Sequence, residues 1–89
     1  MIDTFLEYHK KKPVLVDLPE GEKIEVFITN KNVMDDYSGE YYLNVNIHNR
    51  DNYKRLSDNM IEHYVYQHMV NYLKLFSIEG HIYIKFNYL

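Results

Sequence analysis

The strongest constraint on the fold is a strict alternation of side chains over residues 41–48. Its apolar members are Tyr41, Leu43, Val45 and Ile47, and its more polar members are Tyr42, Asn44, Asn46 and His48. Successive side chains of a β-strand point to opposite faces of the sheet. The run therefore predicts a strand with one face in a hydrophobic core and the other in water.

Three further segments alternate in the same way. Their apolar positions are Val14, Val16 and Leu18, then Ile24, Val26 and Ile28, and finally Ile82, Ile84, Phe86 and Tyr88. Pro19-Glu20-Gly21 separates the first two segments and has the residue types of a tight turn, which predicts a hairpin. Residues 30–39 combine turn-forming residues without a period, which indicates a loop.

Two segments have helical spacing. Asp3 can cap a short helix over residues 3–10, and this helix has to end before Pro13. Asn49 or Asp51 can cap a long helix that ends near Ser77, shortly before Gly80. The stripe expected to face the sheet consists of Ser57, Ile61, Tyr64, Val65, His68, Tyr72 and Phe76.

The elements together predict one α+β domain over residues 1–89, in the order α-β-β-β-α-β. A mostly antiparallel four-stranded sheet would carry the long helix on one face, with the short N-terminal helix in addition. Eighty-nine residues, of which 46% are hydrophobic, suffice for a single core. The chain has no cysteine, no secretory leader pattern and no apolar run long enough for a membrane span, so we expect a cytoplasmic protein.

The sequence predicts neither an enzyme nor a metal or cofactor site. His63 and His68 are five residues apart, whereas two ligands on one helical face are usually four apart. No serine lies in a recognised nucleophile motif, and the three glycines form no phosphate-binding loop. His68 lies on the expected core stripe, where we interpret it as a hydrogen-bonded interior histidine rather than a general base.

Basic residues form two small groups, Lys10–Lys12 and the set Arg50, Lys54 and Arg55. Both could bind phosphates, which gives an alternative function in nucleic-acid binding. A helix, three strands and a second helix with basic residues near its start resemble the order of double-stranded RNA-binding domains. The resemblance concerns order alone, and a solvated surface is the other interpretation of these charges.

Acidic and aromatic residues are concentrated between residues 20 and 42. The chain could use this region, together with the sheet face turned away from the helix, to bind a partner protein. The partner-binding residues that we predict are Glu20, Glu22, Glu25, Phe27, Asp35, Asp36, Tyr37, Glu40, Tyr42 and Tyr83. The alternative is that the acids only keep the hairpin end soluble.

The first functional hypothesis is therefore a small non-enzymatic inhibitor or modulator that binds a host protein. The composition, rich in Tyr, Asn, Lys and Ile and without Ala, Trp or Cys, resembles that of phage and mobile-element proteins in general character. A block on a nucleic-acid-handling defence enzyme, as by an anti-CRISPR, is the concrete case. A structural or oligomerisation module is a further alternative, and an edge strand could pair with its own copy to form a homodimer.

Overall fold

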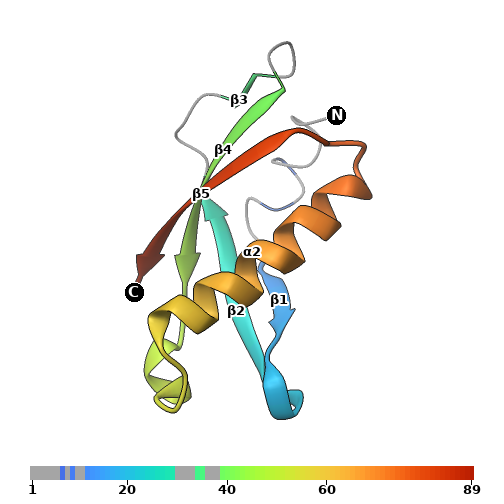
Figure 1. Cartoon of the computed structure of the whole chain (residues 1–89). Coiled ribbons are helices and arrows are strands. Elements are labelled where there is room, and N and C mark those ends of the chain that lie inside the picture. The colour runs from blue at the N-terminus through green and yellow to red at the C-terminus, as the bar shows by residue number, and fades with distance from the viewer. Residues whose placement is uncertain (1–6, 8, 10–11, 30–33, 36–38) are drawn as a thin grey trace.

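The structure is a computed structural model that describes residues 7, 9, 12–29, 34–35 and 39–89. The strands are β1 (Val14–Asp17), β2 (Lys23–Thr29), β3 (Met34–Asp35), β4 (Glu40–Ile47) and β5 (His81–Tyr88). Two 3₁₀ turns, η1 (Pro19–Gly21) and η2 (Arg50–Tyr53), precede the helix α2 (Asp58–Lys74). The predicted α+β class is confirmed, and α2 lies across one face of the sheet (Figure 1).

The sheet is mixed. β1 and β2 form the predicted hairpin, and β2 continues the sheet by pairing antiparallel with the second half of β4. β3 pairs antiparallel with the first residues of β4, on the same side as β2. β5 pairs parallel with β4 over all eight of its residues, from Glu40 opposite His81 to Ile47 opposite Tyr88.

The parallel pair follows from the length of the helix between β4 and β5. Eight strand residues extend about 26 Å, and the 17 residues of α2 rise about 25 Å. The helix therefore returns the chain to the end at which β4 began, and β5 has to run in the same direction as β4. Alternation in the sequence predicts which side chains face the core, but it carries no information on strand direction.

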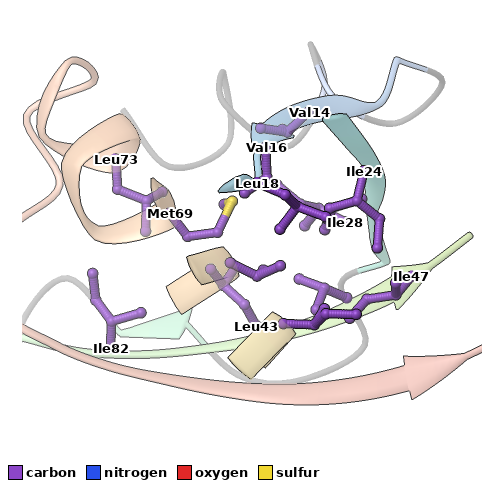
Figure 2. Packing of buried hydrophobic residues seen from close by; sticks show 14 of the residues in the cluster. Val14, Val16, Leu18, Ile24, Ile28, Leu43, Ile47, Met69, Leu73 and Ile82 are labelled. Atoms are coloured by element: carbon purple, nitrogen blue, oxygen red, sulfur yellow. The ribbon is translucent and has the colours of Figure 1, made fainter. Parts of the chain in front are cut away.

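The core lies between α2 and the alternating apolar positions of the strands (Figure 2). Four helix residues at i, i+4 spacing are buried: Ile61, Val65, Met69 and Leu73. The predicted stripe was correct for Ile61 and Val65 and wrong for Ser57, which is exposed. Tyr64, His68, Tyr72 and Phe76 are only partly buried beside the core, because the helix is rotated so that Met69 and Leu73 face the sheet.

The helix begins later than predicted. Ser57, not Asn49 or Asp51, is the N-cap, and its hydroxyl accepts the backbone N–H of Met60 at 3.2 Å. That bond satisfies one of the amides that the first turn of a helix leaves unpaired. Residues 50–53 form the separate turn η2 instead.

The predicted helix over residues 3–10 lies outside the described residues, apart from Glu7 and His9. His9 is 3% exposed and packs edge-on against the rings of Tyr72 and Phe76 on α2. Its Nδ1 lies 3.5 Å from the carbonyl of Lys12, and its Nε2 lies 2.8 Å from the Tyr72 hydroxyl. Because a carbonyl only accepts, this arrangement fits a neutral imidazole that donates from Nδ1 and accepts at Nε2.

We expect His9 to make the fold less stable in mild acid. Burial lowers the pKa of His9 below the ordinary 6.5, so the unfolded chain binds the proton more readily than the folded one. The contribution of neutral His9 is complete above pH 6.5 and is lost progressively as the pH falls below that value. Urea unfolding at about pH 7.5 and about pH 5 measures the difference. His9→Gln should show a smaller loss between the two conditions, and an equal loss in both proteins would contradict the assignment.

Candidate functional site

One face of the sheet is turned away from α2, and we call it the open face. It is formed by strand residues of β1, β2, β4 and β5 that alternate with the core positions, leaving aside the end residues Asp17, Lys23 and His81, and by His48, which follows β4. Its members are Leu15, Glu25, Phe27, Thr29, Glu40, Tyr42, Asn44, Asn46, His48, Tyr83, Lys85 and Asn87. Of the helices that the structure describes, α2 packs on the other face (Figure 1).

A stacked pair of tyrosines marks one end of the open face. Tyr42 of β4 lies opposite Tyr83 of β5, and their ring centroids are 4.8 Å apart with planes inclined by only 14°. Tyr42 is 37% exposed and Tyr83 is 47% exposed. The Tyr42 hydroxyl donates to Glu40 Oε2 at 3.4 Å, and the charge of Glu40 is the main cause that raises the pKa of Tyr42. The pair therefore presents two stacked aromatic rings to solvent, with the Tyr42 hydroxyl bonded to Glu40.

A second apolar group marks the other end. Phe27 of β2 contacts the His48 ring at a centroid distance of 4.5 Å. Leu15 of β1 is 50% exposed and lies opposite Glu25, two residues before Phe27 on the same face. The open face therefore has one aromatic group near each of its ends.

Amide side chains lie between the two aromatic groups. Asn44 lies in the sheet between Thr29 and Lys85, and Asn46 lies between Phe27 and Asn87. Asn44 is 9% exposed, whereas the neighbouring Lys85 is exposed. Asn44 is therefore too buried to contact a partner, whereas the half-buried Asn46 and Asn87 can both donate and accept hydrogen bonds.

The structure brings five of the ten predicted partner-binding residues onto this face: Glu25, Phe27, Glu40, Tyr42 and Tyr83. Glu20 and Glu22 lie instead at the hairpin turn, and Asp35 belongs to β3. Asp36 and Tyr37 lie outside the described residues. His48 was not among the predicted residues, although its place in the 41–48 alternation was a sufficient signal.

The acids of the hairpin are paired within the molecule. Arg55 forms ion pairs with Glu22 and, at 3.6 Å, with Glu20, and it donates to the Pro19 carbonyl at 3.1 Å. Lys23 and Asp17 form another pair at 2.5 Å across β1 and β2. These contacts reduce the negative field that the hairpin would otherwise present to a partner.

The predicted basic group is also engaged in local contacts. Arg50 donates to Asp58 at 2.7 Å and to the carbonyls of Tyr53 and Leu56 at 2.8 and 2.6 Å. It therefore holds η2 against the start of α2. Lys54 is exposed, while Lys10 and Lys11 lie outside the described residues.

Arg50→Ala is expected to lower the free energy of unfolding by about 2 kcal/mol, because it removes charge-assisted bonds to two carbonyls and a carboxylate. Lys54 lies four residues further along the chain and its side chain is exposed, so Lys54→Ala should change the free energy of unfolding by less than about 0.5 kcal/mol. Chemical denaturation followed by circular dichroism measures both. An equal loss of unfolding free energy in the two variants would show that the Arg50 contacts do not stabilise the junction between η2 and α2.

Within the described part of the chain, no three histidine or acidic side chains are grouped so that they could hold a metal ion. No helix in that part of the chain is long and apolar enough to cross a membrane.

No protein-family model matches this chain, and comparisons with curated proteins and with solved structures found no match either.

Proposed function

We propose that this protein acts by binding rather than by catalysis, and that its contact surface is the open face. The observation that supports the proposal most is the stacked pair Tyr42–Tyr83, which lies exposed on the face that α2 does not cover. Exposed aromatic rings are costly to leave in water, and they provide a large contact area at a small loss of side-chain entropy.

We propose a protein as the partner. The two aromatic groups with amides between them have the composition of protein interfaces, in which rings supply burial and polar groups supply adaptable hydrogen bonds. The charges of the face include Glu25 and Glu40 against Lys85, and the whole chain has a net charge of −3. A surface without an excess of positive charge suits a protein better than a phosphate backbone.

An inhibitor of a nucleic-acid-handling protein is the specific form of this proposal. Such a protein has a basic surface, which Glu25 and Glu40 at the two ends of the open face would complement. The paired acids Glu20 and Glu22 would contribute less, because Arg55 already neutralises part of their field. We propose further that the partner acts in host defence and that a phage encodes the chain.

The test compares three immobilised proteins in nuclease-treated lysate from the native host, the cells in which the chain is expressed. The first is the unmodified protein, the second is the open-face variant Tyr42→Ser/Tyr83→Ser, and the third is the helix-side variant Met60→Ser/Leu75→Ser. Met60 and Leu75 are 44% and 78% exposed, so the third variant removes a comparable apolar surface elsewhere. Quantitative mass spectrometry identifies the proteins retained by each.

The same protein should be retained by the unmodified chain and by the helix-side variant, and its retention should fall at least about tenfold on the open-face variant. The two tyrosines contribute about 1 kcal/mol to the fold as a pair, so the open-face variant should still fold. Equal retention on all three proteins would contradict the proposal.

Nucleic-acid binding is the second candidate, because bases could stack on Tyr42 and Tyr83 beside Lys85. Fluorescence anisotropy with a labelled single-stranded oligonucleotide distinguishes it from protein binding. Binding that weakens steeply as salt increases and that depends on Tyr83 would favour this second candidate. No binding at low salt would exclude it.

A further inference from the structure

The outer edge of β5 presents main-chain hydrogen-bonding groups in a regular series. His81 donates its N–H to the Gly39 carbonyl at 2.8 Å, and Leu89 donates to the Ile47 carbonyl at 3.1 Å. Successive strand residues direct their main-chain groups to opposite sides, so the odd-numbered residues pair with β4. The even-numbered residues Ile82, Ile84, Phe86 and Tyr88 therefore direct their N–H and C=O groups away from the sheet.

One end of this edge is closed by the helix. The Tyr66 hydroxyl of α2 donates to the Ile82 carbonyl at 3.1 Å, which satisfies one of the outward groups. Among the described residues, no strand pairs with the outer edge of the remaining section, which runs from Ile84 to Tyr88 with Phe86 at its midpoint.

The opposite edge of the sheet, β1, has several features that prevent strand addition, whereas β5 has fewer: the charge of Lys85 and the Tyr66 contact at Ile82. β1 has four residues, lies between Pro13 and Pro19, and is closed by the Asp17–Lys23 ion pair. Proline, charge and short length are the usual protections of an exposed edge. β5 has eight residues without proline or glycine, and its core-side residues Ile84 and Phe86 are only half buried.

We propose that β5 pairs antiparallel with β5 of a second copy of this chain, about a twofold axis through Phe86. In that register Ile84 lies opposite Tyr88 of the second copy, and Lys85 lies opposite Asn87 of the second copy. An axis through Lys85 would place two lysines opposite each other, which is destabilising. An axis through Ile84 would require the Ile82 carbonyl that Tyr66 occupies.

The pairing has a structural consequence for the open face. A twofold axis perpendicular to the sheet leaves both α2 helices on one side and both open faces on the other. The half-buried side chain of Phe86 would be covered by Phe86 of the second copy, and that of Ile84 by Tyr88 of the second copy. The dimer would thus present two copies of the Tyr42–Tyr83 pair on one continuous sheet.

Disulfide formation between single-cysteine variants tests both the association and its register. The chain has no cysteine of its own, so Lys85→Cys and Asn87→Cys each introduce the only thiol. Residues 85 and 87 of opposite copies would lie about 4.5 Å apart between Cα atoms, within the range of a disulfide. Two copies of residue 85, or of residue 87, would be diagonal at about 7–8 Å.

The two variants are oxidised separately and as an equal mixture, and the products are resolved by non-reducing electrophoresis. The disulfide-linked dimer should form at least about fivefold faster in the mixture than with either variant alone, because only residues 85 and 87 of opposite copies are close enough to link. Sedimentation velocity of the unmodified chain should show a mass that rises with concentration toward twice 10.9 kDa. Linkage of Lys85→Cys alone, equal rates in all samples, or a monomer at every concentration would overturn the proposal while leaving the proposed function untouched.

Discussion

Gly80→Ala is expected to destabilise the protein by about 3–5 kcal/mol, which places it among the most damaging single substitutions. A Cβ at this position would lie 2.2 Å from the Gly39 carbonyl oxygen, a backbone atom that cannot rotate away. The backbone at Gly80 has φ +154°, a conformation that residues with a side chain rarely adopt. The same Gly39 carbonyl accepts the first bond of the parallel β4–β5 pair, from the N–H of His81.

Gly21→Ala is the matched control for this prediction. Gly21 also has a positive φ, +80°, but nothing lies within 4 Å of the position of an added Cβ. Its cost should be limited to the conformational penalty of about 1–2 kcal/mol. Urea unfolding of both variants measures the difference in the free energy of unfolding. If Gly80→Ala lowers it no more than Gly21→Ala does, Gly80 does not approach the Gly39 carbonyl so closely.

Met69→Ala is expected to lower the free energy of unfolding by about 2–5 kcal/mol, because it leaves a cavity where α2 faces the sheet. Met69 is fully buried in the cluster that joins α2 to the strands (Figure 2). His68→Ala, at the neighbouring helix position, should cost less than about 1.5 kcal/mol, since His68 is only partly buried and stacks on Tyr72 at the edge of the core.

The comparison of these two variants distinguishes the observed helix orientation from the one that the sequence suggested. The stripe predicted from the sequence includes His68 and omits Met69. Thermal or chemical denaturation of both variants therefore tests the rotation of α2 directly. A larger loss for His68→Ala than for Met69→Ala would contradict the observed packing.

The alternating patterns predicted the strands well because burial of one sheet face imposes a period of two on the side chains. Val14, Ile24, Leu43 and Ile82 were all expected in the core, and all are buried. The orientation of α2 was harder to predict because the helix is amphipathic only in part. Aromatic residues such as Tyr72 and Phe76 lie beside the buried row, so the period of 3.6 fits two adjacent stripes.

The length match that explains the parallel pairing of β5 depends on the observed start of the helix at Asp58, because a helix from residue 49 or 51 to 77 would be about 40 Å long. A helix that matches the length of the preceding strand brings the chain back to its starting end, which favours a parallel partner. The contacts of His9 could not be anticipated, since 63 residues separate it from Tyr72. Pairings over such distances depend on how the elements pack and leave no local pattern in the sequence.

The candidate site was predictable in part for the same reasons. Tyr42 and Tyr83 were assigned to the exposed face by alternation alone, but their stacking depends on the β4–β5 register. Glu20 and Glu22 were counted as available charges because their partner, Arg55, follows far along the chain. A sequence pattern gives the side of a strand on which a charge lies, while the partner of that charge requires the tertiary structure.

Site-specific photo-crosslinking in the native host cells, in which the chain is expressed, tests the proposed role of the open face most directly. A photoreactive benzoylphenylalanine replaces Tyr83 on the open face in one variant and the exposed Leu75 beyond α2 in another. We predict that position 83 crosslinks to one protein and that position 75 does not. Crosslinks from position 75 alone, crosslinks from position 83 to nucleic acid only, or none from position 83 would contradict this prediction.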